Sequence, residues 1–373
     1  VLTAHTIAPT LHITAAVLDD ELSHKVTRVG ANSVITPFDT AGQFLNSMTF
    51  RPVVSDFFIS LLFDPNAPHQ LLQLTVLEDS MWEGRTIGEL ELDKHYGVDV
   101  IGIRYADAHY GYAPSADHRL QEDETLVVVS PNDHVETLLQ ICHGDFRFAR
   151  TPLFQPLPMR NEPLASDHSY SLIEAEEAAR SLKKHFIICG DDRVIRSAIS
   201  RLNPERPFVI VSNDNTLTSN LLKRGFRVIH GRPTNEEILQ KAGVKRAQAI
   251  MVSLEEKADS ILTILNARTL NRRLLITATA SSDDMVDKLD RAGADRIINP
   301  FHVAAEFILL STIRPELAQF VHAIQFNYHT QLETTEIYME DNSVWIGETI
   351  AELGLMETYQ AGVIGIREAN KQT

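Results

Sequence analysis

The chain has 373 residues, of which 44% are hydrophobic and 23% charged, enough for a hydrophobic core in two or three domains. Its net charge of −16 argues against the basic surface that nucleic-acid binding requires, so we expect no nucleic-acid partner. The two cysteines, Cys142 and Cys189, are far apart in sequence, which excludes a disulfide framework and a zinc site and favours a reducing compartment. The longest apolar runs fall far short of the roughly 20 residues that span a bilayer.

The first and last parts of the chain repeat each other. RVGANSVITPF (Arg28–Phe38) returns as RAGADRIINPF (Arg291–Phe301), 263 residues further along the chain. The same offset pairs Trp82 with Trp345 and aligns residues 1–110 with the last part of the chain without a gap. We therefore expect incomplete copies of one long unit, with the chain forming part of a longer polypeptide.

A small α+β module follows the first apolar helix pattern. The sequence from Leu71 to Ile141 alternates strand, turn, short helix, two strands and a final helix, over a length typical of a small domain. The next stretch, Thr151–Ser169, has four prolines and few paired apolar positions, which is typical of an extended linker.

Beyond the linker, short apolar runs alternate with amphipathic stretches. Strands are predicted at 185–189, 207–214, 226–231, 247–254, 273–279 and 296–300, and helices at 194–202, 218–225, 234–243, 259–270 and 282–293. This alternation predicts an α/β fold with a doubly wound, Rossmann-like parallel sheet. The long apolar pattern after it, Val303–Val321, is interrupted at Pro315, and we interpret it as an interface helix.

The order of these segments resembles RCK domains, the regulators of K⁺ conductance of TrkA type. The nucleotide-binding half is represented by "IICG", "GRPTNEEILQKAGVKRAQAIMVS" and "LDRAGADRIINP", and the C-terminal half by "DSMWEGRTIGELELDKHYGVDVIGIR". The resemblance implies two RCK units in tandem. They comprise half of a first Rossmann-like lobe with its crossover helix (1–64), the first C-terminal lobe (65–150), a linker (151–183), a second Rossmann-like lobe with crossover helix (184–325) and a truncated second C-terminal lobe (326–373).

The resemblance also implies a function. RCK domains lie on the cytoplasmic side of the cell membrane and couple ligand binding to a potassium pore, so K⁺ would be the transported ion. Four chains with two units each would self-associate into a tetramer with an eight-domain gating ring. The Arg51–Pro52 pair in the crossover helix favours a channel whose pore domain lies upstream on the same polypeptide. The alternative is a peripheral regulatory subunit of a Trk or Ktr potassium uptake system.

The expected nucleotide site departs from the G-x-G-x-x-G fingerprint. Gly190 holds the first glycine position, but Asp192 occupies the second, where pyrophosphate approaches the backbone, and Ile195 the third. The remaining cleft candidates come from the turns after the first three strands. Together the site residues are Gly190, Asp191, Asp192, Arg193, Val194, Ser212, Asn213, Asp214, Gly231, Arg232, Pro233 and Thr234.

Two interpretations of this cleft stay open. Arg193, Arg196 and Arg232 bring positive charge to it, so a mononucleotide could bind in a shifted pose; otherwise the lobe keeps its fold for ring assembly with an empty cleft. NAD or ADP is expected rather in the first unit, whose glycine turn is absent from this sequence.

Metal and catalytic signals are weak. Acidic residues of the C-terminal module offer oxygen ligands for Ca²⁺, although we favour turn and surface roles for them; the candidates are Glu78, Asp79, Glu122 and Asp123. No catalytic motif is present, so we expect no enzyme. A soluble NAD(P)-dependent oxidoreductase is the remaining alternative, and the altered glycine turn argues against it.

Overall fold

The computed structural model describes residues 1–64, 66–77, 80–107, 109–135, 137–138, 169–202 and 204–326, with short stretches between 337 and 366. Two compact units divide the chain, one drawing on Val1–Pro52 and Gln155–Leu309, the other on Val53–Phe154 and Leu310–Thr373. Each unit therefore combines segments of both sequence repeats. Most of the predicted second C-terminal lobe lies outside the described residues. Among those described, no helix has both the length and the hydropathy to cross a membrane.

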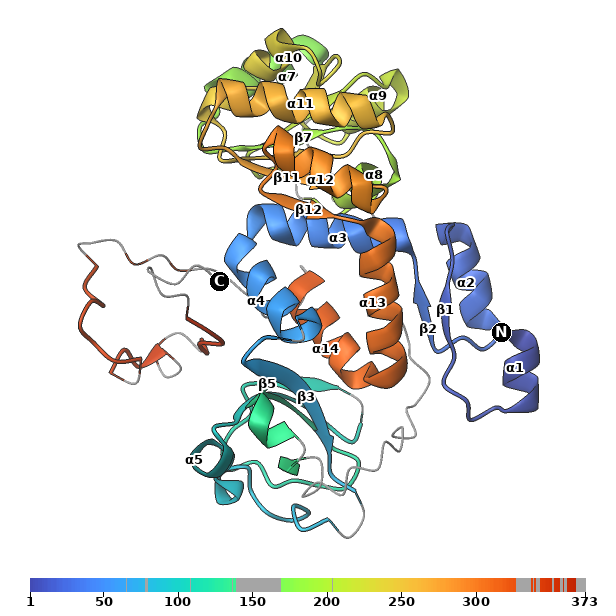
Figure 1. Ribbon diagram of the computed structural model, residues 1–373, viewed down its shortest axis with the longest axis vertical. Helices are drawn as coiled ribbons and strands as arrows, with labels where there is room; N and C mark the ends of the chain where they lie inside the picture. Colours follow the sequence, from blue (N-terminus) through green and yellow to red (C-terminus); the bar gives the residue numbers. More distant parts are fainter. Residues whose placement is uncertain are drawn as a thin grey trace. The chain divides into compact units, whose positions relative to one another are not determined.

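The second repeat contains a six-stranded parallel sheet with the order β12-β11-β10-β7-β8-β9. Its strands β7, β11 and β12 are labelled in Figure 1. Its strands are β7 (Phe186–Cys189), β8 (Phe208–Ser212), β9 (Val228–His230), β10 (Ala249–Val252), β11 (Leu275–Thr279) and β12 (Arg296–Ile298). The intervening helices are α8 (Arg193–Ser200), α9 (Asn215–Lys223), α10 (Glu236–Lys241), α11 (Lys257–Leu270) and α12 (Asp283–Ala292). The chain runs outward in both directions from the neighbouring strands β7 and β10, which confirms the predicted doubly wound α/β fold.

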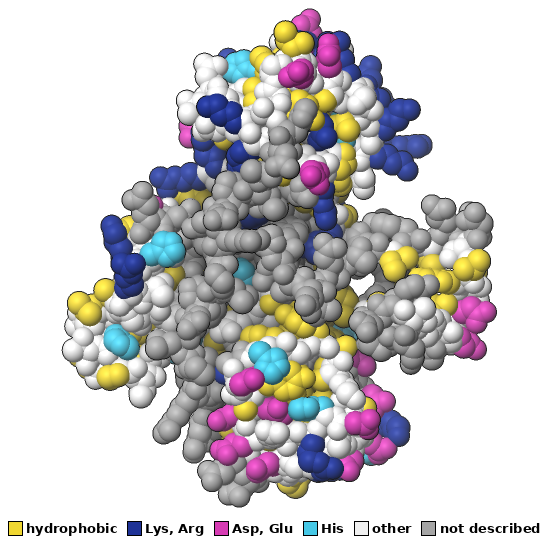
Figure 2. Space-filling view, turned by 180° about the vertical axis from the view of Figure 1, so that it is seen from behind, with side chains coloured by type: hydrophobic (Ala, Val, Ile, Leu, Met, Phe, Trp, Pro, Cys, Tyr) yellow, Lys and Arg dark blue, Asp and Glu magenta, His cyan; other side chains and the backbone are white. Residues whose placement is uncertain are grey.

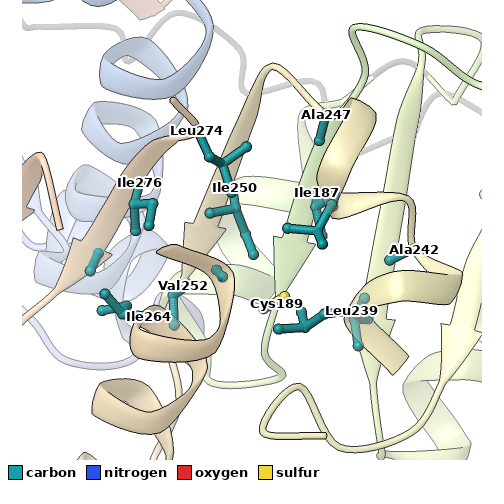
Figure 3. Close-up of a cluster of buried hydrophobic side chains, with 14 of the residues drawn as sticks. Ile187, Cys189, Leu239, Ala242, Ala247, Ile250, Val252, Ile264, Leu274 and Ile276 are labelled. Carbon is teal, nitrogen blue, oxygen red and sulfur yellow. The ribbon is translucent and has the colours of Figure 1, made fainter. Parts of the chain in front are cut away.

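The strands of this sheet are buried on both faces because helices cover each side. Figure 3 shows one face, where Ile187 and Cys189 of β7 and Ile250 and Val252 of β10 pack in a cluster with Ile264 of α11. Since side chains alternate along a strand, the residues between them point to the opposite face. The continuous apolar runs in the sequence follow from this double burial.

Helix α7 (Leu172–Ser181) precedes the sheet, within the range 151–183 that we expected to be a linker. A capping box starts it: the Ser171 hydroxyl accepts from the Glu174 amide, and the Glu174 carboxylate accepts from the Ser171 amide. Ala175 and Ala179 are fully buried, so α7 belongs to the second-repeat lobe.

The first repeat supplies the matching half of a second lobe. A parallel strand pair, β1 (Thr14–Ala16) and β2 (Ser33–Ile35), is accompanied by α1 (Leu2–Ile7) and α2 (Asp20–Arg28). At the offset of the repeat, β1 corresponds to β11, β2 to β12 and α2 to α12. The repeated sequence therefore forms the same local structure twice.

Two crossover helices follow these half-sheets, and each is interrupted by a proline. The pairs are α3 (Pro37–Phe50) with α4 (Pro52–Phe63), and α13 (Pro300–Ile313) with α14 (Pro315–Phe326). Proline lacks an amide hydrogen and restricts the preceding residue, so the first helix of each pair ends just before it. The break predicted at Pro315 is confirmed, and Pro52 repeats it.

The repeats exchange these helices. Within one compact unit, α3 of the first repeat packs on α8, β10 and β11 of the second repeat. Within the other unit, α14 of the second repeat packs on strands of the first C-terminal lobe. The sheet face opposite the cluster in Figure 3 is thus covered partly by a helix from the other repeat.

The first C-terminal lobe has an antiparallel sheet with the order β3-β6-β4-β5. Its elements are β3 (His69–Thr75), α5 (Leu92–Tyr96), β4 (Asp99–Arg104), β5 (Tyr110–Tyr112) and β6 (Thr125–Pro131), with single turns of 3₁₀ helix at 88–90 and 132–134. Helix α14 docks here: the Phe320 ring lies so close to Gly102 that a Cβ on that residue would be 2.0 Å from it. Arg314 donates from Nη1 to the Leu71 carbonyl at 2.9 Å.

Candidate functional site

The cleft lies at the carboxyl edge of the second-repeat sheet, beside the switch point between β7 and β10. Gly190, the last residue before the turn, has a φ of 136°, in a region that side chains rarely adopt. A Cβ at Gly190 would lie 1.8 Å from the Ser253 carbonyl oxygen. Glycine is therefore required here by backbone packing against the end of β10, independently of any ligand.

Asp192 occupies the place where the fingerprint brings pyrophosphate to the helix. Its Oδ1 accepts from the Ile195 amide at 2.9 Å and so caps α8, while its Oδ2 accepts from the Ser253 hydroxyl. The Ser253 hydroxyl in turn contacts the Thr279 hydroxyl at the end of β11. A protein carboxylate thus already binds the amide and hydroxyl that a phosphate would use.

The charge around Asp192 also opposes an anion. Burial raises the pKa of the Asp192 carboxyl, and the nearby carboxylates of Asp191 and Glu255 raise it further, against the hydrogen bonds from Ile195 and Ser253. The pKa of Asp191 is likewise raised, first by burial and then by Asp214. The residues present do not fit a pyrophosphate in the standard dinucleotide pose.

The three arginines expected to bring charge to the cleft each contact protein groups. Arg193 donates from Nη1 to the Leu18 carbonyl at 3.0 Å and lies over the Phe38 ring. Arg196 forms an ion pair with Asp214 across the cleft edge, at 2.5 Å. Arg232 faces Asp259 at 3.9 Å on the exposed surface. Two of the three arginines thus face carboxylates, and Arg193 is held by a carbonyl and an aromatic ring.

The end of β8 holds the residues expected near a ribose. Ser212 is buried, and its hydroxyl accepts from the Asp214 amide at 3.1 Å. Asp214 caps α9 by accepting from the Thr216 and Leu217 amides, at 2.7 and 3.0 Å, which lowers the pKa of its carboxyl. Asp214 is therefore ionised but engaged by the helix and Arg196. Asn213 lies between these two residues in the same turn.

The remaining predicted residues line the turns beside β7 and β9. Val194 is buried in the first turn of α8, and Gly231 follows β9 with the Ile238 side chain packed against its Cα. Pro233 is buried, and the Thr234 carbonyl accepts from Asn266 Nδ2 at 2.9 Å. The structure thus brings the predicted cleft residues to one edge of the sheet, largely in helix-capping and packing roles.

A pocket of about 220 Å³ opens on the β10–β11 side of Asp192. Its lining includes residues that sequence reasoning missed: Leu254, Glu255, Lys257, Ser260, Thr279 and Ser281, together with Phe38 and Phe301 from the two crossover helices. Ser260 is 3% exposed, so it is a buried polar residue at this pocket. The position of these polar residues in the sequence could have identified them, because they lie at or shortly after the carboxyl ends of β10 and β11. Parallel sheets bind ligands at that edge.

The structure describes two of the four metal candidates. Glu78 and Asp79 lie outside the described residues. Glu122 and Asp123 occupy an exposed turn, and in the part of the chain that the structure describes no group of three His, Cys, Asp or Glu side chains could hold a metal. Figure 2 shows acidic side chains gathered on the face of the antiparallel-sheet lobe and basic ones on the second-repeat lobe.

His118 contacts a buried carboxylate in the antiparallel-sheet lobe. Its Nε2 lies 2.9 Å from Glu124 Oε2, and Glu124 also accepts from the Gln121 amide at 3.0 Å. The Tyr105 ring stacks on His109 and meets His118 edge-on. These histidines therefore have structural partners in the lobe.

The described chain thus contains a Rossmann-like lobe with an altered glycine turn and a small lobe with an antiparallel sheet. The TrkA-N domain model matches residues 186–300, and the TrkA-C domain model matches residues 71–143. The two ranges together cover half of the chain. The chain belongs to this family, the RCK domains, as its sequence motifs predicted.

The relatives include potassium transport proteins. Potassium channel protein 1 of Methanocaldococcus jannaschii is 27% identical over 207 residues, 54% of this chain and 61% of that protein. Ktr system potassium uptake protein C of Bacillus subtilis is 23% identical over 192 residues, 51% of this chain and 83% of that protein. The chain thus spans less than two thirds of the length of the channel protein.

The fold has a solved counterpart. The structure of the human SLO3 gating ring matches with a TM-score of 0.60 at 11% identity, over 86% of this chain and 68% of that one. At this identity the match establishes the fold alone.

Proposed function

We propose that the chain is the cytoplasmic gating region of a ligand-regulated potassium channel, on the cytoplasmic side of the cell membrane. The observation that carries the proposal is the order of domains: a TrkA-C domain is followed by a TrkA-N domain, as expected of two RCK units in tandem. The 54% of the chain that aligns with a potassium channel protein supports it. In this proposal the lobes predicted from the sequence are the functional units, and α7 from the predicted linker 151–183 is part of the second Rossmann-like lobe.

The assembly follows from the tandem units. Four chains would self-associate into a ring of eight RCK domains, with the pore on the same polypeptide and K⁺ as the transported ion. The exchange of crossover helices supports a regulatory role, because α3 packs on the second-repeat lobe while the chain after Pro52 belongs to the other compact unit. A ligand that binds one arrangement of the lobes more tightly shifts the equilibrium toward it.

The ligand of the second-repeat cleft is not a dinucleotide in the standard pose. Asp192 supports this view, since its carboxylate caps α8 where pyrophosphate would bind. NAD or ADP is proposed for the first unit, and Ca²⁺ for the acidic surface of the antiparallel-sheet lobe. A mononucleotide bound beside Arg196 is the alternative for the second cleft.

A thermal-shift titration of the purified chain tests ligand binding, with NAD, NADH, ADP, ATP and Ca²⁺ as separate probes. A ligand at 100 times its Kd stabilises the folded chain by about 2.7 kcal/mol, and Asp192→Gly restores the second glycine as a matched variant. We expect a shift with NAD in the variant that exceeds the shift in the parent. An equal response would show that Asp192 is not the barrier, and no response to any nucleotide would refute nucleotide gating by these domains.

Potassium flux tests the channel proposal itself. The gene product that contains this chain is reconstituted into liposomes, and K⁺ flux is measured with and without the ligand found by thermal shift. Flux from this polypeptide alone supports a channel.

The Ktr subunit remains the second candidate, because the alignment covers 83% of the Ktr protein. It predicts flux only after a separate membrane protein is added. The gene sequence before Val1 separates the two: a channel requires apolar spans and a filter sequence there, whereas a subunit requires a complete glycine-rich turn.

A further inference from the structure

Helix α3 of the first repeat fits α8 of the second repeat through three polar or small residues. At Gly42 the helix backbones nearly touch, since a Cβ there would lie 2.9 Å from the Ala198 nitrogen and from the Val194 carbonyl oxygen. Asn46 is fully buried and donates from Nδ2 to the Ala198 carbonyl at 3.0 Å. This carbonyl lies in the last turn of α8, where helices leave acceptors without intrahelical donors.

Asp39 holds the other end of the same contact. Its Oδ1 accepts from the Ser197 hydroxyl at 2.6 Å, and its two carboxylate oxygens accept from Arg201 Nη2 at 2.9 and 2.7 Å. The Asp39 and Arg201 side chains are only 16% and 21% exposed, so the charges meet in a largely desolvated contact. Asp39, Gly42 and Asn46 form what we call the α3 seam.

The second crossover helix lacks this seam although it has the same fold. At the repeat offset, Asp39 corresponds to His302, Gly42 to Ala305 and Asn46 to Leu309, whereas Phe44 corresponds to Phe307. An alanine methyl at the Gly42 position would meet the backbone of α8. A leucine at the Asn46 position would leave the Ala198 carbonyl without its donor. A histidine at the Asp39 position would remove the carboxylate that faces Arg201. Apolar packing is shared by the two helices, while the polar pattern is not.

We propose that the α3 seam selects the pairing of the repeats: α3 recognises the α8 face of a second-repeat lobe, and α13 cannot replace it there. Second-repeat lobes are thereby prevented from pairing with copies of themselves through α13, and a first-repeat helix always meets a second-repeat lobe. Specificity of this kind needs features that penalise the wrong partner as well as contacts that favour the right one.

Asn46 has the properties of a residue that determines selectivity at the expense of stability. Its Oδ1 is buried without a hydrogen-bond partner among the described residues, which lowers stability compared with an apolar side chain. A buried asparagine in coiled coils likewise determines partner and register at a cost in stability. Leu309, at the matching position of α13, is instead 54% exposed.

A disulfide reporter tests the proposal in the whole chain. The hydroxyls of Thr49 on α3 and Thr277 on β11 are 2.6 Å apart in the buried interface. Thr49→Cys with Thr277→Cys, in a background of Cys142→Ala and Cys189→Ala, therefore forms an intramolecular disulfide when α3 is seated. Non-reducing electrophoresis and peptide mapping measure its yield.

The seam is then replaced by the α13 residues, using Asp39→His, Gly42→Ala and Asn46→Leu. The yield should fall at least about tenfold, because losing one buried hydrogen bond to a charged group has an effect of that order. Phe44→Leu, at a position where both helices have phenylalanine, is the matched control and should retain the disulfide. Retention in the seam variant, or equal loss in the control, would overturn the proposal.

A reciprocal variant covers the case in which the seam variant fails to fold. It keeps the seam replacement and adds His302→Asp, Ala305→Gly and Leu309→Asn, with the reporter moved to Thr312→Cys and Thr277→Cys. Thr312 is the repeat equivalent of Thr49. The exchanged helix should now crosslink to the second-repeat lobe, and the absence of this crosslink in a folded chain, judged by circular dichroism, would refute selection by the seam.

Discussion

Replacing Asp192 separates its role as a helix cap from the effect of its charge. Asp192→Ala removes the bond to the Ile195 amide and the bond from the Ser253 hydroxyl. Losing an N-cap costs about 1 kcal/mol of stability. Losing the bond from Ser253 costs less, because the Ser253 hydroxyl keeps its contact with Thr279. For a lobe of this size we expect a fall in Tm of about 2–4 °C.

Asp192→Asn keeps both bonds and removes only the charge. The asparagine Oδ1 can accept from Ile195, and its Nδ2 can donate to the Ser253 oxygen. Because burial raises the pKa of the Asp192 carboxyl, the folded chain holds this proton more tightly than the unfolded chain does. The stabilising contribution of Asp192 is therefore complete below a pH of about 3.8 and is lost as pH rises through the folded pKa.

Differential scanning calorimetry of the parent and both variants, from pH 4 to pH 8, provides the assay. Asp192→Asn should match or exceed the parent at pH 8, and its advantage should shrink as the pH falls toward 4. If Asp192→Asn lowers the Tm as much as Asp192→Ala at pH 8, the ionised carboxylate is stabilising and our account of its pKa is wrong.

Three further predictions use other residues of the same chain. Gly190→Ala should prevent folding of the second-repeat lobe, because its Cβ would lie 1.8 Å from a backbone oxygen. Gly84→Ala, whose Cβ would have no atom within 4 Å, should cost only about 1 kcal/mol of backbone strain. Urea unfolding of the two variants distinguishes these outcomes. Burial raises the pKa of the Cys189 thiol, so it should resist a thiol reagent at pH 8 until denaturant is added, and labelling in the native chain, detected by peptide mapping, would contradict this. Burial lowers the pKa of His185, so the contribution of His185 to stability is present above a pH of about 6.5 and is lost as pH falls through the folded pKa. His185→Phe should flatten the slope of Tm against pH in that window. An unchanged slope would count against this prediction.

The sequence predicted the second-repeat lobe closely because its signals are local. Runs buried on both faces read as strands, and Asn235 caps α10 in the structure. Pro315 ends α13 through covalent geometry, which no tertiary contact can alter. The repeat supplied independent support, since one pattern had to form the same elements twice.

The candidate site was predicted only in part. Gly190 and Asp192 could be judged from the fingerprint, but the roles of Ser253 and Thr279 depend on β10 lying between β7 and β11. Likewise, Arg196 appeared as free positive charge in the sequence, whereas in the fold it meets Asp214. Side-chain partners 18 to 61 residues away in sequence are set by strand order, which local patterns do not specify.

By itself, then, the sequence determined the elements, the family and the position of the altered turn, because propensity, capping and periodicity act over a few residues. Only the tertiary structure decided that α3 covers a lobe of the other repeat. The sequence of α3 is compatible with either lobe as an apolar helix. The choice of lobe depends on whether the α3 seam meets complementary groups on the lobe it covers. These groups, on Ser197, Ala198 and Arg201, meet the seam only in the folded chain.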